Sequence, residues 1–352
     1  MSPATSGPES LRAHQVRIDG TEVAFEVPEG ERILTSARRA GVWLPYECGW
    51  GSCSTCKATL VDGSVSLLFA GAPAVDARDE RRRRILLCQT TPTSDVVIKP
   101  QRVDDGPSDV RPTRDAVGRL VDAEVLGPSI ARFTFELSDS GGHAVVAQFR
   151  PGQFAVLETA PGVRRCYSLA GLPGGRQVQF IAKRYDGPGS RSLFDLGVGA
   201  TIPLELPFGD MWLRSSERPV LLAAGGTGIS AILSMLRQLA EPASAGSGRR
   251  IRVVYGAATP AELVCWEELL ELVSRIPTAT LHGALVAPEA EWNGHTGFVT
   301  HALEDLAGSG EHEDLSSSEA YLAGPPAMVD AVKRAFADLG ITLDRTYVDA
   351  FG

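Results

Sequence analysis

Four cysteines that crowd into one stretch of the chain constrain its fold more than any other feature. They stand at positions 48, 53, 56 and 88, and the first three fall within nine residues. In a chain of 352 residues, such a group suggests a metal centre before it suggests disulfides. We therefore expect Cys48, Cys53, Cys56 and Cys88 to be metal ligands.

The spacing of these cysteines indicates which metal centre they hold. Cys48-x4-Cys53-x2-Cys56, with Cys88 after a further 31 residues, is the plant-type spacing of a [2Fe–2S] cluster. Small residues between the first three ligands let the backbone wrap closely and aim N–H groups at the sulfurs. A structural zinc site is the alternative, but zinc usually takes paired Cys-x2–4-Cys knuckles, which this spacing fits poorly.

The sequence around the cysteines resembles a plant-type ferredoxin domain. The resemblance rests on ERILTSARRAGVWLPYECGWGSCSTCKATLVDG (31–63) and ILLCQTTPTSDVVI (85–98), and it implies a β-grasp domain over residues 13–100. The local patterns agree, because they predict strands at 15–19, 21–27, 57–60 and 95–98 and a helix at 31–40.

A second segment follows a polar stretch, residues 101–117, that contains proline, lacks periodicity and is predicted to be a linker. Residues 118–214 predict an antiparallel β-barrel or sandwich, because short alternating stretches are separated by glycine and proline. The expected strands lie at 119–126, 130–137, 153–158 and 178–183.

Two motifs in this segment resemble the flavin domain of the ferredoxin–NADP reductase superfamily, which implies FAD. They are Phe149-x-Pro-Gly-Gln-Phe154 with Arg165-Cys166-Tyr167-Ser168, and Gly187-Pro-Gly189-Ser190-Arg191-Ser192. The Arg165 fork suits a pyrophosphate, Tyr167 offers a flat surface to the flavin, and Ser168 can lie near flavin N5. Gly189 to Ser192 would bind a phosphate before a short helix at 192–196. The expected cofactor-binding residues are Arg165, Cys166, Tyr167, Ser168, Ala182, Lys183, Gly189, Ser190, Arg191 and Ser192.

Residues 215–352 change to strand–helix alternation, which predicts a parallel α/β nucleotide-binding sheet. Strands are expected at 219–223, 251–255 and 320–322, and helices at 229–239, 261–273 and 327–339. The glycines of GGTG (225–228) would let the backbone approach a pyrophosphate at a helix N-terminus, although a tight βα turn needs glycine as well. A standard Rossmann dehydrogenase fits less well, because no acidic residue ends the second strand.

The superfamily resemblance continues in this third segment, in GGTGIS (225–230), Tyr255-Gly256-Ala and Gly324-Pro325-Pro-Ala-Met328. It implies the remaining cofactor-binding residues, which are Gly225, Gly226, Thr227, Gly228, Gly256, Gly324, Pro325, Met328 and Phe351. Ala323 stands where many members have a cysteine beside the nicotinamide, but hydride transfer between two stacked rings requires no ionisable group there.

The last residues resemble the end of many such reductases, where an aromatic side chain covers the flavin until nicotinamide displaces it. Phe351 and Ser168 are therefore the expected catalytic residues, and a Phe351 tucked into the domain core is the alternative. NADH is expected rather than NADPH, because AATPAE (257–262) offers no arginine for a 2′-phosphate. Glu262 could accept from the ribose hydroxyls, or it could be a solvated acid at a helix N-terminus.

The order ferredoxin, flavin, nicotinamide resembles the single-chain reductase components of bacterial multicomponent oxygenases, such as the benzoate dioxygenase type and the soluble methane, phenol and toluene monooxygenase types. The resemblance implies that NADH gives a hydride to FAD, and that electrons pass singly through the [2Fe–2S] cluster to an oxygenase component or its ferredoxin. Two alternatives stay open: the same redox module serving a deoxysugar dehydratase or a cytochrome, and a non-enzymatic redox sensor.

Charge and hydropathy limit the other partners and the location. The net charge of −9 argues against a nucleic-acid surface, and residues 215–352 hold the whole excess with 9 basic and 18 acidic side chains. No apolar run reaches the roughly 18 residues of a membrane span, and the N-terminus shows no secretory apolar region. We therefore expect a cytoplasmic protein, in a compartment where disulfides are rare.

Overall fold

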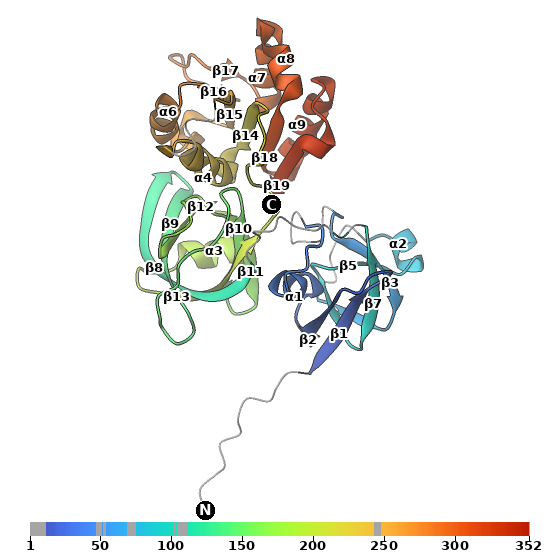
Figure 1. Ribbon diagram of the computed structural model, residues 1–352. Helices are drawn as coiled ribbons and strands as arrows, with labels where there is room; N and C mark the ends of the chain where they lie inside the picture. Colours follow the sequence, from blue (N-terminus) through green and yellow to red (C-terminus); the bar gives the residue numbers. More distant parts are fainter. Residues whose placement is uncertain are drawn as a thin grey trace, which may run out of the picture. The chain divides into compact units, whose positions relative to one another are not determined.

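The chain divides into two compact units, which are described separately. The computed structural model describes residues 12–46, 51, 54–68, 75–101, 103, 112–242 and 248–351. The first unit ends at Thr113, and the second begins at Arg114 (Figure 1). Across these described residues, no helix combines the length and the apolar character that crossing a membrane would require.

The first unit is built on a mixed sheet with the strand order β2-β1-β7-β3-β5. Its elements are β1 (Ala13–Ile18), β2 (Ala24–Pro28), α1 (Ile33–Arg39), β3 (Lys57–Asp62), β4 (Val65–Leu67), α2 (Ala77–Arg81), β5 (Arg84–Leu86), β6 (Thr90–Pro92) and β7 (Val96–Pro100). Strands β1 and β7 are parallel, while β2, β3 and β5 join antiparallel to their neighbours. Six of the seven α1 residues are buried. A helix held against a mixed sheet confirms the predicted β-grasp fold.

The second unit begins with an antiparallel sheet in the order β11-β10-β13-β8-β9-β12. Its elements are β8 (Arg114–Gly127), β9 (Ile130–Ser138), β10 (Phe154–Ala160), β11 (Val163–Ser168), β12 (Gln177–Lys183), α3 (Pro188–Phe194) and β13 (Thr201–Phe208). An isolated antiparallel bridge between Leu169 and Phe180 links the two edges of this sheet. The sheet therefore curls into the predicted barrel around buried Phe133, Phe135 and Phe180.

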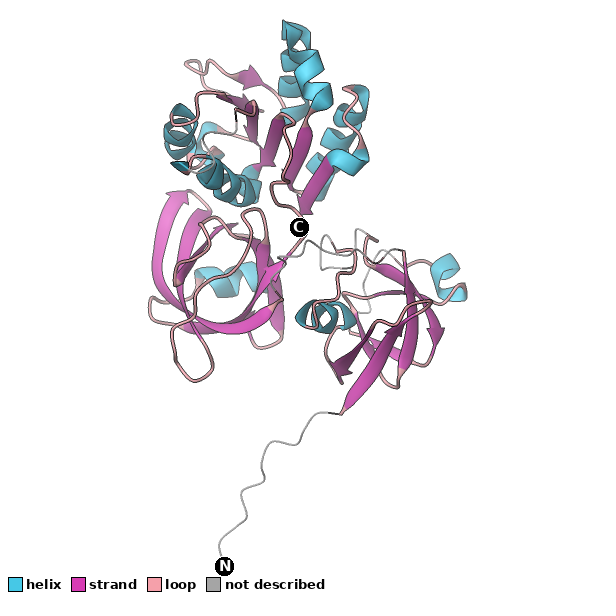
Figure 2. Ribbon diagram, viewed as in Figure 1, coloured by secondary structure: helices cyan, strands magenta, loops and turns pink. Residues whose placement is uncertain are grey.

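The remainder of the second unit is a parallel sheet in the order β17-β16-β15-β14-β18-β19, with helices on both faces (Figure 2). The elements are β14 (Val220–Gly225), α4 (Ile229–Leu239), β15 (Ile251–Ala257), α6 (Trp266–Ser274), β16 (Ala279–Leu285), β17 (His295–Thr296), α7 (Val299–Leu306), α8 (His312–Ser317), β18 (Glu319–Gly324), α9 (Pro326–Asp338) and β19 (Thr346–Ala350). Short helical turns occupy Gly226–Gly228, Pro260–Glu262, Ala307–Glu311 and Leu343–Arg345. The predicted parallel α/β domain is confirmed.

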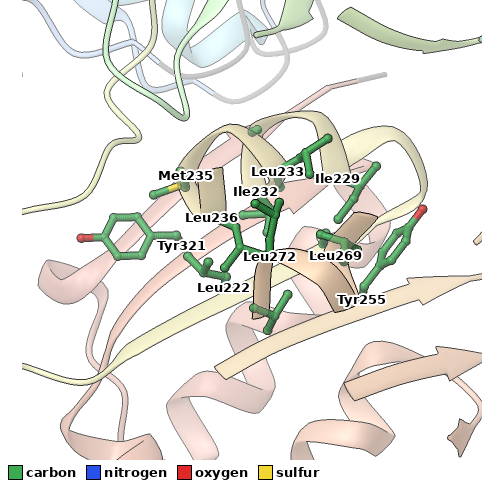
Figure 3. Packing of buried hydrophobic residues seen from close by; sticks show 14 of the residues in the cluster. Leu222, Ile229, Ile232, Leu233, Met235, Leu236, Tyr255, Leu269, Leu272 and Tyr321 are labelled. Carbon is green, nitrogen blue, oxygen red and sulfur yellow. The ribbon is translucent and has the colours of Figure 1, made fainter. Parts of the chain in front are cut away.

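Successive residues of a strand point to opposite sides of the parallel sheet, and helices bury both of these faces. Leu222 of β14 faces α4 and α6, where it packs with Ile232 and Leu269 (Figure 3). Its neighbour Leu221 faces α7 and α9 in a second apolar cluster. The sheet is therefore a rigid platform whose carboxyl edge carries the glycine loops.

Several predicted boundaries are wrong for identifiable reasons. The linker predicted at 101–117 is too long, because its last four residues pair with β13 at the start of β8. The short helix predicted at 192–196 begins at Pro188, a residue whose fixed φ favours the first helical turn. The helix predicted at 261–273 is split, since a 3-10 turn ends at Glu262 and α6 begins at Trp266.

Candidate functional site

Two of the four predicted cysteine ligands, Cys56 and Cys88, lie in the described part of the chain, and they converge. Cys56 directly precedes β3 and Cys88 follows β5, and these antiparallel strands pair Lys57 with Leu86. The Cys56 and Cys88 sulfurs lie 3.2 Å apart, are buried, and form no disulfide. Cys48 and Cys53 lie outside the described residues, within which no group of three or more ligand side chains is arranged around a metal. Two buried thiols at this distance, with no disulfide between them, fit shared ligation of a cluster.

Strand β11 carries the predicted flavin residues on one short segment. Burial raises the pKa of Tyr167 to about 12, with Arg165 acting in the opposite direction, so its phenol stays neutral at ordinary pH. Arg165 lies across the start of α3, because a Cβ added at Gly189 would come within 2.5 Å of its Cγ. A guanidinium beside a helix start is a donor set that fits a pyrophosphate such as that of FAD.

The side chains at the start of α3 are already engaged within the barrel. The Ser190 hydroxyl donates to the Lys183 carbonyl at 3.1 Å and accepts from the Tyr185 backbone N–H at 2.8 Å. Ser192 donates to the Pro188 carbonyl, and exposed Arg191 pairs with Asp186 at 3.2 Å. Backbone N–H groups, rather than these two hydroxyls, are thus the donors that α3 offers to a ligand.

Ser168 has a partner that the sequence analysis missed. Its hydroxyl donates to the Asp349 carboxylate at 2.5 Å, and both side chains are buried. Ser168 ends β11 of the barrel, whereas Asp349 belongs to β19 of the parallel sheet, 181 positions later. Alternation in Tyr347-Val-Asp-Ala-Phe351 was the available signal, since it places Tyr347, Asp349 and Phe351 on one side of a strand.

The glycines of the nucleotide loop serve different purposes. Gly226 has φ +53°, and a Cβ there would meet nothing within 4 Å, so this glycine borders open space. A Cβ at Gly228 would lie 2.2 Å from the Ala323 carbonyl oxygen, and one at Gly225 or Gly324 would strike the Met328 sulfur. Only Gly226 of these four leaves room for a ligand, while the others permit close packing beneath the loop.

Three further predicted residues lie within strands of the parallel sheet or the barrel. Gly256 is required by α7, because an added Cβ would lie 2.5 Å from Val299. Ala182 is buried in β12, and Cys166 is half-buried in β11. Ala323, which replaces the family cysteine, is fully buried between Ala224 and Asp349 in the sheet register.

The carboxyl edge of the sheet also carries an ion pair and an exposed aromatic ring. Lys183 of β12 pairs with Glu262 after β15, with Nζ and Oε1 2.6 Å apart. Phe298, which directly precedes α7, is 62% exposed, which is unusual for so large an apolar side chain. Sequence reasoning missed Phe298, because the short strand β17 before it gives no alternating pattern.

The terminal aromatic residue is neither free nor buried in the core. Phe351 follows β19, its backbone N–H contacts the Gly324 carbonyl at 3.3 Å, and its side chain is half-buried. Phe351 therefore lies at the edge of the sheet where β18 ends at Gly324. Pro325 and Met328 lie at the start of α9, which follows.

Comparisons with known proteins agree with this arrangement. A family model of the 2Fe-2S iron-sulfur cluster binding domain matches residues 16–93, and a model of the oxidoreductase NAD-binding domain matches residues 222–334. The chain is 35% identical to the ferredoxin–NAD(+) reductase component of the alkene monooxygenase system of Xanthobacter autotrophicus, covering 93% of this chain and 98% of that one. It is 33% identical to the reductase component of phenol 2-monooxygenase from a Pseudomonas strain, covering 97% and 96%.

Solved structures extend the likeness to the whole fold. The ferredoxin reductase in carbazole 1,9a-dioxygenase superposes with a TM-score of 0.81 at 29% identity, covering 97% of this chain and 99% of that one. An Amycolatopsis cytochrome P450 reductase gives a TM-score of 0.83 at 25% identity, covering 96% and 99%.

A ferredoxin unit joined to a flavin barrel and a nucleotide-binding sheet defines the class of iron–sulfur flavoprotein oxidoreductases. Within that class, the chain belongs to the family of ferredoxin–NAD(P)+ reductase components of multicomponent oxygenases.

Gly189→Ala tests the contact between Arg165 and α3. The added methyl would enter the space of Arg165, displace its guanidinium and weaken flavin retention, so we expect the FAD content of the purified protein to fall about tenfold, the effect of roughly 1.4 kcal/mol. The measurement is FAD released per chain after denaturation.

Gly187→Ala is the matched control, because a Cβ at Gly187 meets nothing within 4 Å and its φ of −73° suits any residue. Equal FAD content in the two variants would show that Arg165 is not held against α3 for flavin binding.

Proposed function

We propose that this chain takes electrons from NADH and delivers them one at a time to an oxygenase component. The observation that carries the proposal is the pair of converging thiols, Cys56 and Cys88, in the same chain as a flavin barrel and nucleotide sheet. When bound, FAD accepts the two electrons of NADH together and the [2Fe–2S] cluster passes them on singly. The protein's own residues bind the cofactors, orient them and exclude solvent.

In the flavin site, we assign binding to Arg165 and the α3 start, and orientation to Tyr167 and Ser168. The neutral, half-buried Tyr167 ring can lie flat against an aromatic cofactor. The Asp349 carboxylate accepts a hydrogen bond from the Ser168 hydroxyl, and this bond fixes the rotamer of that hydroxyl. Ser168 therefore presents a fixed group toward the flavin.

In the nucleotide site, open space beside Gly226 at the start of α4 suits a pyrophosphate. Exposed Phe298 offers a surface on which an adenine can stack. Glu262, held by Lys183, presents a carboxylate that accepts from ribose hydroxyls and repels a 2′-phosphate. These charges favour NADH over NADPH.

We assign the Phe351 ring to the position against the flavin that the nicotinamide must occupy during hydride transfer. Its side chain is half-buried and its strand ends one residue earlier, so the ring can leave without breaking the β19 ladder. In this proposal, the Phe351 ring excludes solvent from the flavin between turnovers.

The systems to which the related reductases belong indicate the electron acceptor that we propose. Reductases of alkene, phenol and propane monooxygenases, and of dioxygenases, all match nearly the full chain, which favours an oxygenase component. The likeness to a cytochrome P450 reductase supports a haem oxygenase as the second candidate. The cluster needs reduced thiolates, so we place the protein in the cytoplasm.

Cys88→Ala separates the two halves of the proposed electron path. Loss of one thiolate should remove the cluster, so iron and its visible absorption disappear while FAD stays bound to the other unit. We expect NADH-driven reduction of ferricyanide, which a flavin can reduce directly, to stay within about twofold, and reduction of cytochrome c to fall at least tenfold.

Cys265→Ser is the control for loss of a thiol elsewhere, since Cys265 contacts Arg132 in the second unit. A Cys88→Ala protein that keeps its iron, or that loses both activities together, would contradict the proposed path.

Glu262→Gln tests the choice of coenzyme. The substitution removes the carboxylate and leaves the Lys183 ammonium free to attract a 2′-phosphate, so kcat/KM for NADPH relative to NADH should rise about tenfold, which corresponds to roughly 1.4 kcal/mol. Steady-state kinetics with both coenzymes measure the ratio.

Glu267→Gln, on the exposed first turn of α6, is the matched control. An unchanged ratio in Glu262→Gln would remove Glu262 from the coenzyme site.

A further inference from the structure

The guanidinium of Arg214 is sandwiched between two aromatic rings. Its Cζ lies 3.8 Å from the Trp212 ring centroid and 4.2 Å from the Tyr347 ring centroid. Trp212 is buried in the segment that connects the barrel to the parallel sheet, and Tyr347 belongs to β19. A cation between two partly desolvated rings is a strong contact for its size.

Further contacts fix the same group. Arg214 donates from Nη2 to the Asp210 carbonyl at 2.8 Å, and its backbone N–H donates to the Tyr321 hydroxyl at 2.8 Å. The Tyr321 ring in turn stacks on Tyr347, with centroids 5.1 Å apart. None of the described carboxylates pairs with Arg214, so the two rings and the Asp210 carbonyl hold its guanidinium, and the Tyr321 hydroxyl holds its backbone N–H.

The sandwich acts on the strand that carries the Ser168 partner. Tyr347 and Asp349 are two residues apart on β19, so their side chains share one face of the strand about 7 Å apart. Asp349 holds Ser168 of the barrel by a hydrogen bond of 2.5 Å. The β19 backbone also pairs with β18 through Tyr347 and Asp349. The position of Asp349 therefore depends on how firmly Tyr347 is held.

We propose that Arg214 is a positioning residue for hydride transfer, which clamps Tyr347 so that Asp349 stays on Ser168 while the terminal Phe351 moves. The clamp divides the end of the chain into a fixed part, Tyr347 to Asp349, and a displaceable part beyond Ala350. This inference rests on the proposed function of Ser168 and Phe351, and it adds a residue that acts on Ser168 through Tyr347 and Asp349.

The role differs from ordinary stabilisation in what it predicts. A merely structural Arg214 would change melting temperature or FAD content but leave the rate per bound flavin unchanged. A positioning Arg214 acts on the rate at which bound NADH reduces the flavin, because a small misplacement of a reacting group costs much of the rate. NADH affinity should change little, since Arg214 lies outside the Gly226 and Glu262 regions.

The experiment is anaerobic rapid mixing of the full-length, FAD-loaded protein with NADH. For Arg214→Met, which keeps the side-chain length and removes the charge, we expect the limiting rate of flavin reduction to fall about tenfold with the Kd for NADH within about twofold. Tyr347→Leu, which removes the ring, should give the same loss. Arg214→Lys and Tyr347→Phe should recover most of the rate, because each restores a cation or a ring.

Arg119→Met is the control, since Arg119 lies on the exposed barrel surface in an ion pair with Glu136. If Arg214→Met and Tyr347→Leu match the wild-type limiting rate per bound flavin, the positioning role is wrong. The same holds if Tyr347→Phe loses as much rate as Tyr347→Leu. Failure of the wild type itself to be reduced by NADH would instead contradict the proposed function.

Discussion

One buried hydrogen bond, from the Ser168 hydroxyl to the Asp349 carboxylate, connects the flavin barrel to the far end of the nucleotide sheet. A seam along α4 fixes the same two layers: Ser230 exchanges hydrogen bonds with the Ile181 backbone, and Ser234 donates to the Gly171 carbonyl at 2.5 Å. These serines are spaced i, i+4, so they lie on one face of the helix. Because α4 starts at the glycine loop, the seam fixes the position of that loop relative to the barrel.

The fold was largely predictable because its signals are local. Helix α4 has the predicted bounds Ile229–Leu239, since a predominantly apolar segment follows a glycine loop. Strand β13 was missed because Pro203 and Pro207 interrupt its pattern, although it lies between β10 and β8. Strand β19 was missed because it is short and half-buried, so its alternation is weak.

Candidate site residues could be predicted where a local sequence motif carries them, and could not be predicted where a contact joins distant strands. Spacing identified the glycine loop, but it could not show that Gly228 and Gly256 are required by packing against Ala323 and Val299. Nor could it pair Ser168 with Asp349 or Lys183 with Glu262, since those contacts depend on how sheets are ordered in space. The cysteines were the opposite case, because spacing alone predicts their ligand role, and the paired register of β3 and β5 brings Cys56 and Cys88 together.

The central claim is that one polypeptide couples a two-electron carrier to a one-electron carrier. The most direct measurement is an anaerobic titration of the purified protein with NADH, followed in the visible spectrum, on samples assayed for iron and acid-labile sulfide. We expect two irons and two sulfides per chain, and bleaching of both the flavin and the cluster bands. Zinc in place of iron, or visible bands that NADH leaves unchanged, would contradict it.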